Sequence, residues 1–122
     1  MKKRSRLLRR ADFQRVLARP PVFTGRTIVA FAAIDRHPAL RPPGPGLRVG
    51  VATARRITGA VARNRARRRV REAVRVSVPA GLGGSGMGTP YDVVVIARPA
   101  ALNAPLEQLV AEVRSVWERL PR

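Results

Sequence analysis

Apolar residues along the chain follow two different spacings, one typical of strands and one of helices. Runs that are rich in β-branched residues predict strands, because such side chains pack well on a pleated surface. The first of the long runs is apolar at consecutive positions, as in a strand buried inside a sheet. The predicted strands are residues 22–23, 26–34 (RTIVAFAAI), 47–54 (LRVGVATA) and 91–98 (YDVVVIAR).

Three other segments place apolar residues three or four positions apart, which is the spacing of one helical face. A short helix is expected to begin at Asp12 as its N-cap and to end before Pro20. A longer helix is predicted within residues 55–75, with Thr58 as its N-cap. A third is predicted at the C-terminal end, over residues 106–120. Trp117 falls on the apolar seam of this last helix, so we interpret it as a core residue.

The predicted elements indicate one α+β domain spanning residues 1–122. The long helix lies between two strands, 47–54 and 91–98, and the general preference for such a β-α-β unit is a right-handed crossover. The remaining segments are a basic arm at residues 1–10, a proline-rich loop at 35–46 and a glycine-rich loop at 79–90.

Positive charge is concentrated in the long predicted helix. Nine of the 21 residues at positions 55–75 are arginine and one is acidic, so this stretch carries +8 of the chain's net charge of +18. Its narrow apolar face is formed by Ala62, Ala66, Val70, Ala73 and Val74. Arginines four residues apart repel one another on a helix unless a polyanion neutralises them. Because guanidinium groups pair bidentately with phosphate, this helix is predicted to bind nucleic acid.

The sequence contains few groups that could catalyse a reaction. It has no cysteine and a single histidine, His37, in the proline-rich loop. The aspartates are separated in sequence, and no triad or metal-ligand pattern is visible. We therefore expect no catalytic residue and no metal ligand in the protein, so that any reaction would depend on a partner. No apolar run has the length of a membrane span, and the N-terminus lacks the apolar core of a signal peptide, so a soluble, cytoplasmic protein is expected.

The segment LRVGVATARRITGAVARNRARRRVRE, residues 47–72, closely resembles the signature of the bacterial ribonuclease P protein component family. That signature has an RVG strand, a basic pair, an Ile-x-x-Ala-Val run and an RNR-x-x-R core. The resemblance extends upstream and downstream, and its further matching residues are Arg6-Leu7, Asp12-Phe13, Arg26, Tyr91-Asp92 and Ala97-Arg98-Pro99.

The resemblance implies a subunit of an RNA-based endonuclease that removes the 5′ leader from precursor tRNA. In this family the catalytic RNA subunit performs the reaction with bound magnesium, and the protein binds that RNA and the leader. The implied fold is α-β-β-β-α-β-α, with a four-stranded sheet and a left-handed crossover at the arginine-rich helix.

The family's binding residues can be carried over to matching positions of this chain. The resemblance implies contacts with the RNA subunit by Arg63, Asn64, Arg65, Arg67, Arg68 and Arg71. It implies a leader-binding cleft lined by Phe13, Phe31, Ala52, Arg55 and Arg56. Leu17 stands where the family often has an aromatic residue, Ala52 where a hydroxyl is common, and Arg55-Arg56 where a lysine-rich pair is common.

Two alternatives remain open at this point. Phe13 and Phe31 are consistent either with base stacking or with the hydrophobic core. A structural or ribosomal RNA-binding protein without a role in tRNA processing would have the same composition, and only the order of the motifs argues against it. A cationic membrane-active protein is disfavoured, because the arginine-rich helix has a small Ala/Val seam and no bulky apolar face.

Overall fold

The computed structural model describes residues 10–35, 46–79 and 90–121. Apart from their end residues, the predicted basic arm and the two predicted loops lie outside these ranges, and so does His37.

The described residues form four strands, three α-helices and one short 3-10 helix. In chain order they are α1 (Arg10–Leu17), β1 (Phe23–Thr24), β2 (Ile28–Ile34), β3 (Arg48–Thr53), α2 (Ala60–Ser77), β4 (Tyr91–Ala97), η3 (Pro99–Leu102) and α4 (Leu106–Glu118). This order confirms the predicted α+β class and the α-β-β-β-α-β-α arrangement, with η3 added before the last helix.

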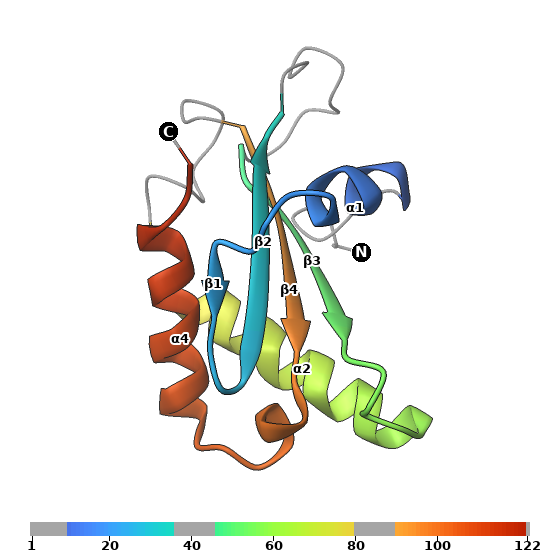
Figure 1. The fold of residues 1–122 in the computed structure, drawn as a ribbon. Coiled ribbons are helices and arrows are strands. Elements are labelled where there is room, and N and C mark those ends of the chain that lie inside the picture. The colour runs from blue at the N-terminus through green and yellow to red at the C-terminus, as the bar shows by residue number, and fades with distance from the viewer. Residues whose placement is uncertain (1–9, 36–45, 80–89, 122) are drawn as a thin grey trace.

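The strands form one sheet in the order β1-β2-β4-β3 (Figure 1). β2 is antiparallel to both of its neighbours, β1 and β4, whereas β3 and β4 are parallel. Parallel neighbours need a crossover connection, which α2 provides. In Figure 1 β3 and β4 run downward, α2 lies behind the sheet, and the chain passes leftward from β3 to β4. The crossover is therefore left-handed, as the family resemblance implied and contrary to the general preference.

The two faces of the sheet belong to separate hydrophobic clusters. Alternate residues of β4 point to opposite faces, so Val93 and Val95 join the larger cluster and Val94 joins the smaller one. The larger cluster holds the buried faces of α2 and α4, including Val70 and Leu109. The smaller cluster lies under α1, across the front of the sheet in Figure 1. The main core is therefore shared by α2, α4 and the back of the sheet.

Trp117 joins α4 to the end of α2, which confirms its prediction as a core residue. Its side chain is 7% exposed, and its indole Nε1 donates a hydrogen bond to Ser77 Oγ at 3.0 Å. Tyr91 Oη donates to the carbonyl of Pro121 and so fastens the chain beyond α4 to the start of β4.

Both predicted helix N-caps are wrong. α2 begins at Ala60 after Gly59, whose φ of 88° is readily accessible to glycine, and no side chain caps the helix. Thr58 precedes that turn and is too early in the chain to act as the cap. α1 begins at Arg10, so Asp12 lies inside its first turn, where the carboxylate forms ion pairs instead. The predicted strand 26–34 begins only at Ile28, because Gly25 N donates to Ile28 O and closes a turn.

We expect Thr27→Val to stabilise the fold. Thr27 is fully buried, and among the described residues its hydroxyl has no hydrogen-bond partner. Valine has nearly the same shape, so the substitution removes the cost of the unpaired hydroxyl, about 1 kcal/mol in the free energy of unfolding. Urea denaturation measures the change. Thr24→Val, at an exposed site on β1, is the control and should change stability by less than about 0.5 kcal/mol. Loss of stability in Thr27→Val would show that the hydroxyl is satisfied.

Candidate nucleic-acid interface

The arginines of α2 are held away from the sheet by the seam that was predicted to be apolar. Ala66, Val70 and Ala73 are fully buried against the core. The six residues predicted to bind RNA lie around the outer side of the helix, and we call them the arginine face: Arg63, Asn64, Arg65, Arg67, Arg68 and Arg71. Arg63, Asn64, Arg65 and Arg68 are exposed, whereas Arg67 and Arg71 are half-buried.

The segment that contains the arginine face has no acidic residue. Residues 53–71 include eight arginines and neither aspartate nor glutamate. The next residue, Glu72, pairs with Arg75 through bonds of 3.0 Å to Nε and 2.6 Å to Nη2. This pairing lowers the pKa of Glu72 and raises that of Arg75. The uncompensated positive charge of α2 therefore lies in its first two-thirds.

Hydrogen bonds give individual arginines of α2 different roles. Arg67 Nη2 donates to Asn64 Oδ1 at 2.9 Å, so the asparagine orients a neighbouring guanidinium within the arginine face. Arg69 instead donates to two carbonyls, those of Ala101 and Ala104, both at 2.6 Å. Because both ends of its guanidinium are engaged, Arg69 fastens the η3 segment to α2. Composition alone gave no means of separating this arginine from its neighbours.

Val61 lies among these cations and was not singled out in the sequence. It is 82% exposed in the first turn of α2. Asn64, Arg65 and Arg68 follow it at the three-, four- and seven-residue spacings of one helical face. Its place opposite the apolar seam could have been recognised from a helical projection of residues 55–75.

A second surface lies on the opposite side of the sheet, next to α1. Residues on this side form three rows across β2, β4 and β3. The rows are Ala33–Asp92–Arg48, Phe31–Val94–Gly50 and Val29–Ile96–Ala52. α1 packs over the first two, and in Figure 1 no described helix lies over the lower part of this face. We call Val29, Ile96 and Ala52 the open row, because all three side chains are only half-buried.

The structure brings Phe13 and Phe31 together beside this open row. Both are half-buried, and both pack against the small cluster of Val16, Ala33 and Val94. They therefore belong partly to the core and partly to the surface, and base stacking by these residues stays a prediction. The structure describes a partly exposed apolar surface at these residues.

The other residues predicted for the leader surface lie at the same end of the sheet. Ala52 is in the open row, and Arg55 and Arg56 are exposed in the turn that follows β3. Val29 and Ile96 were missed by the sequence reasoning. Val29 could have been found from its spacing of two residues from Phe31, because alternate residues of a strand share a face.

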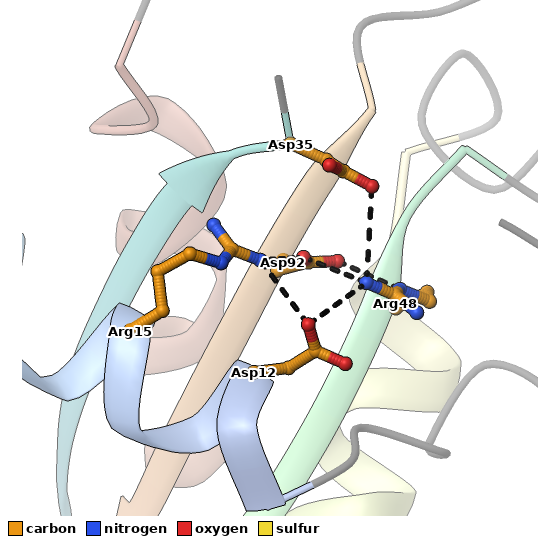
Figure 2. A network of polar contacts seen from close by, with 5 residues as sticks. All are labelled: Asp12, Arg15, Asp35, Arg48 and Asp92. Carbon is orange, nitrogen blue, oxygen red and sulfur yellow. Dashed lines mark hydrogen bonds and ion pairs between the residues drawn. The ribbon is translucent and has the colours of Figure 1, made fainter. Parts of the chain in front are cut away.

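A network of charged residues joins α1 to the sheet (Figure 2). Asp92, fully buried on β4, accepts hydrogen bonds from Arg48 Nε at 2.8 Å and Nη2 at 2.9 Å. These bonds raise the pKa of Arg48, although burial acts in the opposite direction. Arg15 of α1 also donates to Asp92. Asp12 and Asp35 lie 3.6 and 3.9 Å from Arg48 Nη2.

The described residues contain no group of three histidine, cysteine or acidic side chains that could hold a metal ion. Asp12, Asp35 and Asp92, which do come together, share the guanidinium of Arg48. These carboxylates are therefore unsuited to holding magnesium. Among the described helices, none is sufficiently long and apolar to cross a membrane.

Comparisons with known proteins agree over nearly the whole chain. The sequence model of the family described as Ribonuclease P matches residues 1–121. The ribonuclease P protein component of Symbiobacterium thermophilum is 42% identical over 119 residues, which are 98% of this chain and 93% of the relative. That of Chloroflexus aggregans is 41% identical over 115 residues, 93% and 75% of the two chains.

Two solved structures have the same fold. The RNase P protein of Staphylococcus aureus matches with a TM-score of 0.66 and 23% identity over 93% of each chain. The RNase P protein of Thermotoga maritima matches with a TM-score of 0.68 and 19% identity, over 96% of this chain and 98% of that one. The match to the family model and the two relatives show that this chain belongs to the ribonuclease P protein component family.

Proposed function

We propose that the chain binds the catalytic RNA subunit of ribonuclease P through the arginine face and the 5′ leader of precursor tRNA beside the open row. The observation that carries the first part is the acid-free run of eight arginines at residues 53–71, with Arg63, Arg65 and Arg68 exposed. RNA phosphates supply the negative charge that such a face requires.

The leader surface is supported by the residues that surround the open row. Single-stranded RNA is bound where flat side chains offer stacking and cations follow the phosphates. Half-buried Phe13 and Phe31 provide the flat side chains. Exposed Arg55 and Arg56 provide the cations. The two surfaces lie on opposite sides of the sheet, so the protein can contact its RNA subunit and its substrate together.

Within this proposal the protein contributes binding, and the RNA subunit performs the cleavage. Asp12, Asp35 and Asp92 are engaged with arginine, so they leave no carboxylate cluster for magnesium. The metal that the reaction uses is therefore assigned to the RNA. The holoenzyme would act in the cytoplasm, where it would give tRNA its mature 5′ end.

The purified protein alone should leave precursor tRNA intact, because its described residues contain no group of three histidine, cysteine or acidic side chains that could hold a metal ion. Incubating RNA-free protein with precursor tRNA and magnesium, with and without added RNA subunit, measures this. Cleavage at the mature 5′ end should require the RNA subunit. Specific maturation by the protein alone would contradict the proposed division of roles.

Binding to the RNA subunit should weaken steeply with salt, and Arg65→Ala and Arg68→Ala should each reduce that dependence. One lost phosphate contact should lower the slope of log Kd against log salt by about 0.7–0.9. Filter binding between low and moderate salt measures the slope. Arg114→Ala, at an exposed arginine on the mixed-charge helix α4, is the matched control and should leave it unchanged. If the slope of log Kd against log salt were the same in all three variants, the arginine face would be excluded as the site that binds the RNA subunit.

Phe31→Leu should weaken binding of precursor tRNA to the holoenzyme and leave binding of mature tRNA unchanged. Leucine keeps apolar contact with the small cluster but loses the flat ring, and stacking of a base on an aromatic ring is worth about 1–3 kcal/mol. The expected loss is therefore about fivefold or more.

Phe23→Leu is the matched control, because this half-buried phenylalanine packs against the larger cluster with Arg119 over its ring. It should leave the ratio of precursor to mature affinity unchanged. Equal losses for both tRNAs in Phe31→Leu, or a large fall in melting temperature, would assign Phe31 to the core. Unchanged affinity for both tRNAs would exclude a leader contact at Phe31. If the chain were only a structural RNA-binding protein, neither variant would distinguish precursor from mature tRNA.

A further inference from the structure

The apolar contacts of α1 are few for a helix that must keep a fixed position. α1 has eight residues, and an isolated helix of this length is unstable in water. Among the described residues, Val16 is the one buried residue of α1, and it joins a cluster in which Ala33 and Val94 are the other buried members. By contrast, α2 and α4 each bury four residues. Within the described part of the chain, ion pairs therefore supplement the apolar contacts of α1.

Two charged pairs meet at the contact between α1 and the sheet (Figure 2). The sheet supplies Arg48 and Asp92, which are direct neighbours in the parallel register of β3 and β4. α1 supplies Asp12 and Arg15, which are three residues apart and so lie on the same face of the helix. Arg15 binds Asp92, and Asp12 lies 3.6 Å from Arg48. We call these four residues the charge clamp.

The signs of the clamp alternate, and this restricts the movement of α1. Turning the helix or moving it by one residue would place like charges together or would separate both pairs. The pairing with Asp92 takes place at a fully buried carboxylate, where water screens the interaction little. The clamp therefore sets both the position and the rotation of α1 on the sheet.

Phe13 lies in the sequence between the two clamp residues of α1. Its ring reaches the small cluster that also receives Phe31, so its place beside Phe31 depends on the rotation of the helix. We propose that the charge clamp positions Phe13 for binding of the precursor leader, and that Arg15 is a positioning residue for substrate selection. This inference rests on the proposed leader surface beside the open row.

Arg15→Met tests the clamp without leaving a buried charge unpaired. Asp92 keeps its two hydrogen bonds with Arg48, and methionine keeps part of the aliphatic stem. We expect faster amide hydrogen exchange in residues 10–17 of the holoenzyme. We also expect a roughly tenfold loss of precursor affinity, by analogy with other charge-assisted hydrogen bonds. Affinity for mature tRNA and for the RNA subunit should stay within about twofold, because α2 lies on the other side of the sheet.

Three further variants make the outcome specific. Arg15→Lys keeps the charge and should restore most of the precursor affinity. Asp12→Asn weakens the pair between Asp12 and Arg48 and should lower precursor affinity by a smaller factor. This variant tests the clamp if Arg15→Met is poorly folded. Arg10→Met removes an exposed arginine from the same helix and should change neither exchange nor affinity.

Faster exchange with unchanged precursor affinity, or no change in either, would overturn the positioning role. Equal losses for precursor and mature tRNA would overturn it as well, because they would indicate a general structural role. Phe31→Leu in the same assay separates this failure from that of the leader surface. If Phe31→Leu lowers precursor affinity and Arg15→Met does not, the clamp is wrong and the surface stands. If Phe31→Leu leaves precursor affinity unchanged, the leader surface itself fails.

Discussion

β4 is paired along both edges and covered on both faces over most of its length, and the other elements take their positions from it. It hydrogen-bonds to β2 on one side and β3 on the other, and Val93, Val94 and Val95 are fully buried. A strand covered on both faces must be apolar at consecutive positions, which is the pattern of its sequence. The parallel pairing with β3 then requires a crossover helix, and this places α2 and its arginines on one side of the sheet.

That separation of sides gives the molecule two surfaces with different chemistry. The α2 side presents a dense, acid-free set of guanidinium groups beyond a large apolar core. The α1 side presents a small apolar cluster, partly exposed aromatic rings and the open row. A single domain thus carries two surfaces of different chemistry on opposite sides of one sheet.

The seven acidic residues are placed where they do not weaken the arginine face. Asp12, Asp35 and Asp92 gather around Arg48, and three glutamates lie on α4. The seventh, Glu72, pairs with Arg75 beyond the arginine face. In a chain of net charge +18, this distribution leaves the positive charge of residues 53–71 without compensation from the protein. The arginines also differ from one another, since Arg69 binds two backbone carbonyls, Arg65 binds one, and Arg67 binds the side chain of Asn64.

The residue pattern by itself determined the three long strands, the three α-helices and the apolar seam of α2. Each of these depends on local spacing, because a face that must be buried repeats with the period of its element. The order of motifs also identified the family. The spacing did not place the starts of the helices. α2 begins after Gly59, whose φ of 88° is a backbone feature that periodicity does not show, and Asp12 lies inside α1 and not at its N-cap.

Only the tertiary structure decided which residues from different elements meet. Asp12, Arg48 and Asp92 lie in three separate parts of the sequence. The register of β3 with β4 places Arg48 beside Asp92, and the packing of α1 on the sheet adds Asp12. The hand of the crossover was also decided by the tertiary structure, since the periodicity of the connecting helix is the same for either hand. Phe13 and Phe31 were recognisable as apolar, but their shared position at the edge of a small cluster depends on how α1 crosses the sheet. Local spacing therefore specified the elements, and long-range packing and charge pairing specified the surfaces.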